Sequence, residues 1–455
     1  MSDANDIQER ALLERLSDAS ELLKQTFLRQ YRRYRGGDDG LWDWSEIGPP
    51  ESDDLIDVSL IDRLACEEQG RAELAKLVVI KLNGGLGTTM DLSHAKSLVP
   101  VRDGRSFLQL VVEQIGAVRQ RYACDLPLLL MNSYRTRDDC LPVVQTLIQP
   151  GGLPHDFLQH KVPRIDTATA GPLSTGDPSE WWAPPGHGDI YLALFAGGLL
   201  RRLVDHGYRW AFVSNVDNLA ATVDPALLGL LAQRQVEFAM EVTDKTAADI
   251  KGGTLVRYRG RLNLLERAQV APQHIADFQD ISKLRVFNTN SLWWRLDALL
   301  ERLERGALDL PLIVNPKRVA GCEVVQLETA MGAAIGSFPR AAGLRVPRSR
   351  FAPVKGTEDL LVVRSDAYQL DEAVGLRPSD PAAPLPVVRL DARYYRGLAD
   401  LEMRVPHSLG MAGCRSLTIE GDVRFGKNVV LSGDVSLRGG DQHAPLHIAN
   451  GTRLG

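Results

Sequence analysis

Residues 77–90, LVVIKLNGGLGTTM, join a run of aliphatic residues to a glycine-rich turn. Glycine lets a backbone approach a ligand closely, and backbone N–H groups at the carboxyl end of a buried strand commonly bind phosphate. The segment matches neither G-x-x-x-x-G-K-[ST] nor G-x-G-x-x-G. Taken alone, it is equally consistent with a phosphate-binding loop and with a plain tight turn.

Charged residues elsewhere have types that phosphate chemistry uses. Lys96 follows the glycine turn closely enough for its side chain to reach back over a phosphate. Asp217 follows an apolar run, where a carboxylate could bind Mg²⁺ together with phosphate oxygens. Ordinary alternatives exist, because most lysines are solvated and an aspartate after a strand often closes an Asx turn. Lys81 is a weaker candidate, since it could simply solvate the end of its strand.

The elements that would position these residues follow an α/β pattern. From about Ala75 onward apolar runs alternate with helical stretches, which is typical of a mostly parallel sheet. A helix is predicted over residues 106–122, whose apolar side chains recur at helical spacing. Ligands bind at the carboxyl ends of such strands, so the loops there are expected to form one cleft. The predicted strands are residues 77–82, 127–133, 210–215, 237–242, 254–258 and 286–294.

The N-terminal segment is predicted to be helical from about Ile7 to about Tyr34, because its leucines and Phe27 recur at helical spacing. A basic cluster near the end of this helix complements the helix dipole and is interpreted as a solvated face. The tryptophans of the connector at residues 36–50 are expected to dock on the next domain. We therefore assign residues 1–74 to an N-terminal helical segment and connector. The basic cluster is Arg29, Arg32, Arg33 and Arg35.

A proline-rich stretch at residues 377–386 predicts a boundary between a catalytic domain, residues 75–376, and a C-terminal domain, residues 377–455. In the C-terminal domain apolar residues recur every six positions, which is typical of a parallel β-helix. So few repeats could also form a β-hairpin array. An exposed last coil would be a contact surface. The two interleaved sets are Leu417, Val423, Val429, Val435 and Ile419, Phe425, Leu431, Leu437.

Length and composition limit the class of protein. The 455 residues suffice for two or three domains, and a formal net charge of −5 argues against a general nucleic-acid binder. No apolar run approaches the roughly 20 residues that span a bilayer. The five cysteines include no C-x-x-C pair, which favours buried thiols in a reducing cytosol. We expect a cytoplasmic protein with neither a nucleic-acid nor a membrane partner.

Further motifs occur in a defined order along the chain. They are AKSLVPV at residues 95–101, QHKVPRI at 159–165, WWAPPGHGDIY at 181–191, FVSNVDNLAATVD at 212–224, LLERAQV at 264–270, FNTNSLWW at 287–294 and VPRSRFAPVKGTEDLL at 346–361. With the glycine loop, they closely resemble the eukaryotic-type UTP–glucose-1-phosphate uridylyltransferase family, also called UDP-glucose pyrophosphorylases. The resemblance covers nearly the whole chain. It implies a nucleotidyltransferase (Rossmann-like) mixed α/β sheet with flanking helices, followed by a short left-handed parallel β-helix.

The resemblance also implies the reaction and the residues that perform it. UTP and glucose 1-phosphate would give UDP-glucose and pyrophosphate with Mg²⁺, and the β-helix could mediate a homo-oligomer. Lys96 and Lys355 would be catalytic cations, and Asp217 would be the metal ligand. The implied nucleotide-binding residues are Leu82, Asn83, Gly84, Gly85, Gln159 and Gly186, with Gln159 reading uracil. The implied sugar-phosphate-binding residues are His187, Asn215, Glu266 and Asn290.

The sequence departs from the family pattern beside the glycine loop. Asp91 stands where the family usually has glycine, and His94-Ala95 replaces Gly-Pro. An acid beside a triphosphate would oppose UTP unless a cation compensates it, so we expect the Asp91 carboxylate to point outward.

Three other functions remain open. The first is the same chemistry on another sugar or cyclitol 1-phosphate, with UTP or another nucleotide. The second is a UDP-N-acetylhexosamine pyrophosphorylase. The glycine loop of that group carries an arginine after Gly-Thr, and Thr88, Thr89 and Met90 of this chain argue against it. The third is a catalytically silent nucleotide-binding scaffold.

Overall fold

A computed structural model describes residues 2–246, 249–250, 252–371, 375–441 and 443–455. The chain forms two compact units, each assembled from separate segments of the sequence. Unit 1 contains Met1–Ile80, Phe157–Val213 and Pro225–Val346, and unit 2 contains Lys81–Asp156, Ser214–Asp224 and Pro347–Gly455. No helix in the described part of the chain is long and apolar enough to cross a membrane. The domain limits at residues 74 and 376 stay a prediction.

The core of unit 1 is a mixed β-sheet with the strand order β2-β18-β12-β15-β11. Strands β2, β18 and β12 are parallel neighbours, whereas β15 is antiparallel to both β12 and β11. The predicted strands are confirmed, and the sheet is mixed, as the resemblance implies, because β15 runs against both of its neighbours. The bounds are Leu55–Asp57 for β2, Ala341–Arg345 for β18, Phe238–Asp244 for β12, Val286–Arg295 for β15 and Trp210–Asn215 for β11.

A separate three-stranded sheet in unit 1 holds the tryptophan connector. It contains β1 (Ile47–Gly48), β13 (Thr254–Tyr258) and β14 (Arg261–Leu265). The ring of Trp42 stacks on Tyr258 at a centroid distance of 4.3 Å, and Trp44 stacks on His274 at 5.0 Å. The predicted docking of the connector is therefore confirmed. The strand predicted at residues 254–258 forms, but it pairs outside the central sheet.

The N-terminal segment forms two helices, α1 (Ser2–Arg15) and α2 (Glu21–Arg35), so the prediction of one continuous helix is wrong. Ser20 ends the break because its hydroxyl accepts a hydrogen bond from the Leu23 N–H at 3.2 Å and caps α2. Both helices contribute buried apolar residues to one cluster, among them Leu12 of α1 and Phe27 of α2. In the basic cluster, Arg32 pairs with Glu9 at 2.6 Å with 63% of its side chain exposed, in keeping with a solvated face.

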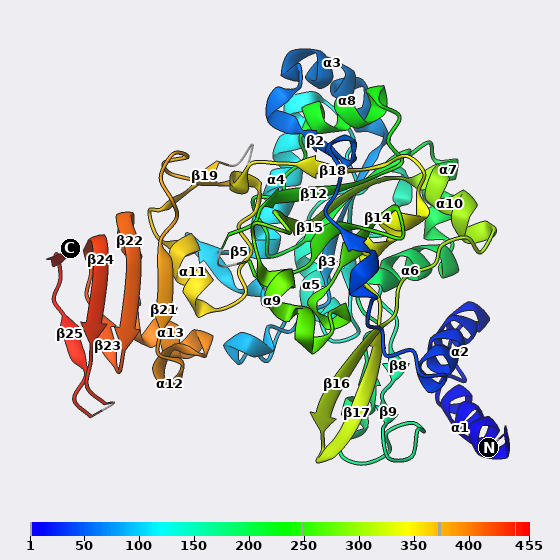
Figure 1. Cartoon of the computed structure of the whole chain (residues 1–455). Helices are drawn as coiled ribbons and strands as arrows, with labels where there is room; N and C mark the ends of the chain where they lie inside the picture. The colour runs from blue at the N-terminus through cyan, green and yellow to red at the C-terminus, as the bar shows by residue number, and fades with distance from the viewer. Residues whose placement is uncertain (1, 247–248, 251, 372–374, 442) are drawn as a thin grey trace. The chain divides into compact units, whose positions relative to one another are not determined.

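Helices and a hairpin complete unit 1 (Figure 1). Helices α3 (Arg63–Glu73) and α8 (Pro225–Gln233) lie side by side because each has a glycine at the contact. A Cβ at Gly70 would lie 1.7 Å from the Pro225 carbonyl oxygen, and one at Gly229 would lie 1.8 Å from that of Cys66. Strands β16 (Ile313–Val319) and β17 (Cys322–Glu328) form the hairpin. The other helices are α6 (Ile190–Ala196), α7 (Leu199–Asp205), α9 (Ile275–Gln279) and α10 (Leu296–Glu304).

Unit 2 begins inside β3 (Leu77–Asn83), whose last three residues lead into the glycine loop. Strand β6 (Leu128–Asn132) is its neighbour in the sheet order. Helix α4 (Phe107–Tyr122) confirms the predicted helix, and Ser106 and Gln109 form a capping box at its start. The unit also contains α5 (Arg137–Val144) and α11 (Thr357–Arg364).

Parallel strands follow at the end of unit 2. Strands β21, β22, β24 and β26 form one sheet, and β23 pairs with β25 in another. All of these pairings are parallel, which rules out the β-hairpin array, and we call this group of strands the C-terminal strand module. Leu417 and Ile419 of the repeat are buried and lie in register with Val435 and Leu437. The bounds are Val387–Leu390, Gly410–Glu420, Val423–Phe425, Val430–Arg438, Leu446–Ile448 and Arg453–Leu454 for β21 to β26.

Candidate functional site

The glycine loop leaves β3 with its backbone accessible. Gly85 is exposed, and a Cβ built on it would meet no atom within 4 Å. Gly87 has φ +67°, a left-handed conformation that favours glycine. The Lys96 N–H donates to the Gly85 carbonyl at 3.3 Å, and the Val216 N–H donates to the Leu82 carbonyl at 3.1 Å. The loop therefore presents backbone at the carboxyl end of β3, as the sequence predicts.

A buried polar network supports this loop from behind. The Asn83 side-chain amide donates to Asn132 Oδ1 at 2.7 Å, and Asn132 in turn donates to Asp156 at 3.1 Å. Arg137 pairs with the same aspartate at 2.7 Å. The Asn83 side chain is committed to this network, and its carbonyl accepts from Thr136 Oγ1 at 2.7 Å, so this residue holds the start of the glycine loop in place. Sequence reasoning missed Asn132, although its place at the end of the next strand was a usable signal.

Lys96 and Asp217, which are 121 residues apart, meet in unit 2. Lys96 Nζ lies 2.5 Å from Asp217 Oδ2, and the two side chains are 14% and 15% exposed. Lys96 Nζ also donates to the Val354 carbonyl, and Thr89 Oγ1 donates to the Lys355 carbonyl at 2.8 Å. The fold thus brings the glycine loop, Lys96, Asp217 and the Lys355 segment together.

The Asp217 carboxylate has one oxygen suited to a cation. Its Oδ1 atom is buried, and no donor in the described part of the chain reaches it. A buried carboxylate oxygen without a hydrogen-bond donor is costly unless a ligand satisfies it. The described residues contain no group of three or more His, Cys, Asp or Glu that could hold a metal. A cation bound here would take one protein carboxylate and draw its other oxygen ligands from phosphates.

Two neighbouring polar residues have different positions. Asn215 is the last residue of β11 and lies two residues before Asp217, so the strand that places Asp217 also places Asn215. Lys81 is only 2% exposed, and its Nζ donates to Ser214 Oγ at 2.7 Å and to the Ala221 carbonyl at 2.9 Å. The interpretation of Lys81 as a phosphate ligand or a solvated residue is wrong, because this ammonium ties two segments of the core together.

Gln159 and Gly186 contact each other in unit 1. Gln159 Nε2 donates to the Gly186 carbonyl at 2.8 Å, which fixes the side-chain amide with Oε1 on the opposite side. Gly186 has φ +80°, and a Cβ there would lie 2.3 Å from the Thr329 carbonyl oxygen. Only glycine fits this turn without a shift of the backbone. A planar base beside Gly186 would therefore meet an amide of defined orientation.

His187 is held as a neutral imidazole. Burial lowers its pKa to about 4, so the ring carries no charge at neutral pH. The Met331 N–H donates to His187 Nδ1 at 2.9 Å, which requires Nδ1 to be the unprotonated nitrogen. The proton is then on Nε2, which can donate a hydrogen bond. A hydrogen-bond donor at this position is compatible with the contact to the sugar phosphate that the resemblance implies.

Glu266 and Asn290 are placed by two local features of unit 1. Gly253 makes room for Glu266, since a Cβ there would lie 2.8 Å from Glu266 Oε1. Asn290 has φ +59° and lies where the register between β12 and β15 shifts. Such β-bulges re-aim a side chain out of the regular alternation of a strand. The resemblance implied both residues. The bulge could not be predicted, because the apolar pattern of β15 does not indicate it.

Asp91 is compensated by an arginine. Its carboxylate lies 3.6 Å from Arg396, and its side chain is 55% exposed. The φ of +52° explains why glycine is the usual residue here, and aspartate is among the side chains that tolerate this conformation. Compensation by an arginine is one of the arrangements that the sequence allowed.

Solved structures share the fold over nearly the whole chain. One, titled as a mutant of UDP-glucose pyrophosphorylase from Leishmania major in complex with UDP-glucose, is 38% identical, covers 98% of each chain and has a TM-score of 0.90. A UDP-glucose phosphorylase from Trypanosoma brucei is 36% identical, covers 98% of each chain and has a TM-score of 0.87. The fold and the site therefore define this chain as a member of the sugar-nucleotide pyrophosphorylase class.

Sequence comparison gives the particular family. The family model described as UTP–glucose-1-phosphate uridylyltransferase matches residues 24–432. The enzyme of that name from Solanum tuberosum is 43% identical over 93% of this chain and 89% of its own length. That from Hordeum vulgare is 42% identical over 94% and 91%. The chain belongs to the UTP–glucose-1-phosphate uridylyltransferase family, as its motifs predict.

Proposed function

We propose that this protein transfers the uridylyl group of UTP to glucose 1-phosphate and releases pyrophosphate. The observation that carries the proposal is the meeting of Lys96, Asp217 and the Lys355 segment beside the glycine loop. Family membership supports it, since relatives of this length and identity bear the name of that enzyme.

In the proposed reaction a phosphate oxygen of glucose 1-phosphate attacks the α-phosphorus of UTP. The bond from that phosphorus to the bridging oxygen breaks, and pyrophosphate leaves with the electron pair. No proton has to be removed from the attacking group, because a sugar phosphate is already ionised at neutral pH. The main barrier is the approach of two polyanions and the charge on the transferring group, so fixed cations and N–H groups are what the site must supply.

Lys96 would neutralise charge at the α-phosphate, and Lys355 would meet the sugar phosphate. Lys96 pairs with Asp217, so the carboxylate would hold the ammonium in position for the phosphate. Asp217 would hold Mg²⁺ through its buried Oδ1, and the ion would supply positive charge to the phosphates. The backbone of residues 82–85 would add N–H groups beside the nucleotide.

Recognition of the base would depend on the fixed amide of Gln159. One hydrogen of Nε2 is used by the Gly186 carbonyl, so Oε1 faces away from it and can accept from uracil N3–H. Cytosine presents an acceptor at N3 and would place two acceptors together. Gly186 would pack on the ring, and this geometry favours UTP over CTP.

The sugar would be bound by polar groups of unlike charge. His187 Nε2–H could donate to the sugar or its phosphate, and Glu266, Asn290 and Asn215 would meet hydroxyl groups. A rate comparison of UTP, CTP and GTP with glucose, galactose and N-acetylglucosamine 1-phosphates tests these assignments. We expect UTP with glucose 1-phosphate to react fastest. A faster reaction with another sugar phosphate would show that glucose 1-phosphate is not the preferred substrate.

The C-terminal strand module is proposed to be a short left-handed β-helix. Its parallel pairings and buried six-residue repeat support this assignment. We also propose that the protein acts in the cytosol and that the module can join copies of this chain. Sedimentation of the full chain tests the assembly, and a purely monomeric protein would contradict it.

A further inference from the structure

The peptide that carries Lys355 is held by side chains from several segments of unit 2. Thr89 Oγ1 donates to the Lys355 carbonyl at 2.8 Å. The Asp359 carboxylate accepts from the N–H groups of Lys355 at 2.7 Å and Gly356 at 3.1 Å. Thr357, only 3% exposed, donates from Oγ1 to the Tyr395 carbonyl at 2.6 Å. The backbone beside Lys355 is therefore held locally by Asp359 and across the sequence by Thr89 and Tyr395.

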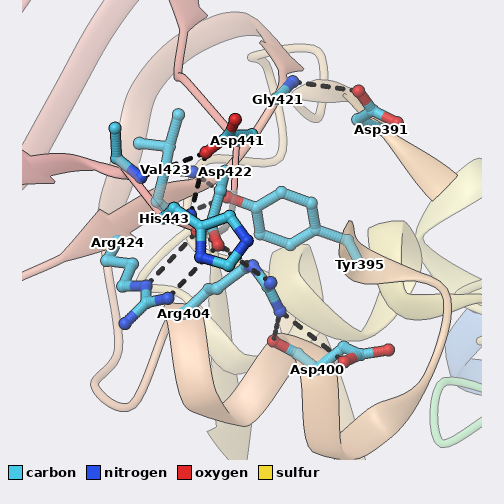
Figure 2. Close-up of polar contacts among 11 residues, drawn as sticks. Asp391, Tyr395, Asp400, Arg404, Gly421, Asp422, Val423, Arg424, Asp441 and His443 are labelled. Carbon is cyan, nitrogen blue, oxygen red and sulfur yellow. Dashed lines mark hydrogen bonds and ion pairs between the residues drawn. The ribbon is translucent and has the colours of Figure 1, made fainter. Parts of the chain in front are cut away.

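Tyr395 is in turn bonded to the C-terminal strand module (Figure 2). Its hydroxyl donates to the Val423 carbonyl at 2.5 Å and accepts from the Val423 N–H at 3.3 Å. Burial raises the pKa of the Tyr395 phenol, so the hydroxyl keeps the proton that it donates. Val423 begins β23. Tyr395 therefore accepts the Thr357 hydrogen bond through its carbonyl and binds strand β23 of the module through its buried hydroxyl.

Two further contacts fix the helices around Tyr395 to the same module, as Figure 2 shows. These helices are α12 (Ala392–Tyr395) and α13 (Leu398–Arg404). Arg404 makes two hydrogen bonds to the fully buried Asp422, at 3.1 Å and 3.0 Å. Asp391, just before α12, accepts from the Gly421 N–H at 2.9 Å. Breaking a buried pair by removing one partner is strongly destabilising, so the α12–α13 junction keeps a fixed position on the module.

The same junction reaches the glycine loop. Arg396 follows Tyr395 directly, and its guanidinium lies 3.6 Å from the Asp91 carboxylate. Both side chains are more than half exposed, so this pair contributes little energy by itself. The buried Thr357 bond is the stronger of the two connections. Together the Thr357 and Arg396 contacts attach the α12–α13 junction to the Lys355 segment and to the glycine loop, which would both contact the reacting phosphates.

We propose that Thr357 and Tyr395 are positioning residues for uridylyl transfer. Through them the α12–α13 junction, fixed on the C-terminal strand module, sets the position of the Lys355 backbone. The inference rests on the proposed function, because it requires Lys355 to meet the sugar phosphate. A cation stabilises a transition state only where its geometry is right, and a displacement of about 1 Å can cost on the order of 10²-fold in rate.

The test replaces the Thr357 hydroxyl with a methyl group of similar size. We expect Thr357→Val to lower kcat about tenfold or more and to change the KM for UTP less than about threefold. Thr357→Ser, which keeps the hydroxyl, should restore most of the rate. Thr167→Val is a control for the same change of side chain, since the exposed Thr167 Oγ1 also donates to a backbone carbonyl, that of Glu323 at 3.0 Å, in unit 1. The control should leave kcat unchanged.

A double-mutant cycle separates positioning from a general loss of structure. If Thr357 acts through Lys355, Lys355→Ala and Lys355→Ala/Thr357→Val should have equal kcat. A wild-type kcat in Thr357→Val, or multiplicative losses in the double variant, would overturn the proposal. If Thr357→Val does not fold, Tyr395→Phe carries the same test, because it removes only the hydroxyl bonds to Val423. Failure of the proposed function would appear separately, as a wild-type protein that releases no pyrophosphate.

Discussion

His187 is neutral in the folded protein, and this makes the free energy of unfolding depend on pH. A substitution of His187 isolates its contribution. The folded protein holds the pKa of His187 at about 4, against 6.5 for an unperturbed histidine. Below pH 6.5 the unfolded chain therefore binds a proton that the folded chain excludes, and the free energy of unfolding falls as the pH falls. The structural reason is burial together with the Met331 N–H, which points at Nδ1 and would oppose a proton there.

The size of the effect follows from the two pKa values. Each pKa unit corresponds to about 1.4 kcal/mol, so His187 would cost about 2 kcal/mol of stability by pH 5 and about 3 kcal/mol by pH 4. The effect should be absent above about pH 7.5 and should level off below pH 4.

The assay is urea denaturation of the wild type and of His187→Asn at pH 8, 6 and 5. Asparagine Oδ1 can accept from the Met331 N–H in place of Nδ1 but does not titrate. The difference between the two proteins removes the contribution of the other histidines. We expect the wild type to lose about 2 kcal/mol more than the variant between pH 8 and pH 5. Equal losses in both proteins would refute the assignment of a buried neutral imidazole.

Two further predictions concern candidate residues of each unit. Lys96→Ala or Lys355→Ala should lower kcat at least tenfold, and ~10²–10³-fold if each is a preorganised cation, without unfolding the protein. Near-normal rates in both would contradict the site assignment. Gly186→Ala should destabilise the protein by about 3 kcal/mol and raise the KM for UTP, because a Cβ would lie 2.3 Å from the Thr329 carbonyl oxygen at φ +80°. Urea denaturation and initial rates check this, and an unchanged KM would mean that the turn does not contact the nucleotide.

Local sequence patterns predicted the elements of this fold well, but not how they pair. The apolar run of β15 identifies a strand, yet nothing in it indicates that the strand runs antiparallel to both neighbours. The N-terminal helix was predicted too long because its apolar spacing continues through the break, while Ser20 followed by Glu21 was a usable capping signal. Strand direction depends on the path of the connections, which apolar periodicity does not record.

In the candidate site, too, local motifs predicted some residues, whereas contacts between distant segments could not be predicted. The glycine loop, Lys96 and Asp217 could be named from their motifs, and the fold brings them together. The burial of Lys81 could not be predicted, because its partners at Ser214 and Ala221 are more than 130 residues away. The contact of Thr357 with Tyr395 likewise joins residues of ordinary type across 38 positions. Such contacts depend on the packed structure and leave no mark in local spacing.

The decisive measurement of the proposed activity is pyrophosphate release by the purified full chain with UTP, Mg²⁺ and glucose 1-phosphate. We expect stoichiometric formation of UDP-glucose and pyrophosphate, with a rate that falls at least tenfold in Lys96→Ala. A protein that binds UTP but releases no pyrophosphate with any sugar 1-phosphate would contradict it.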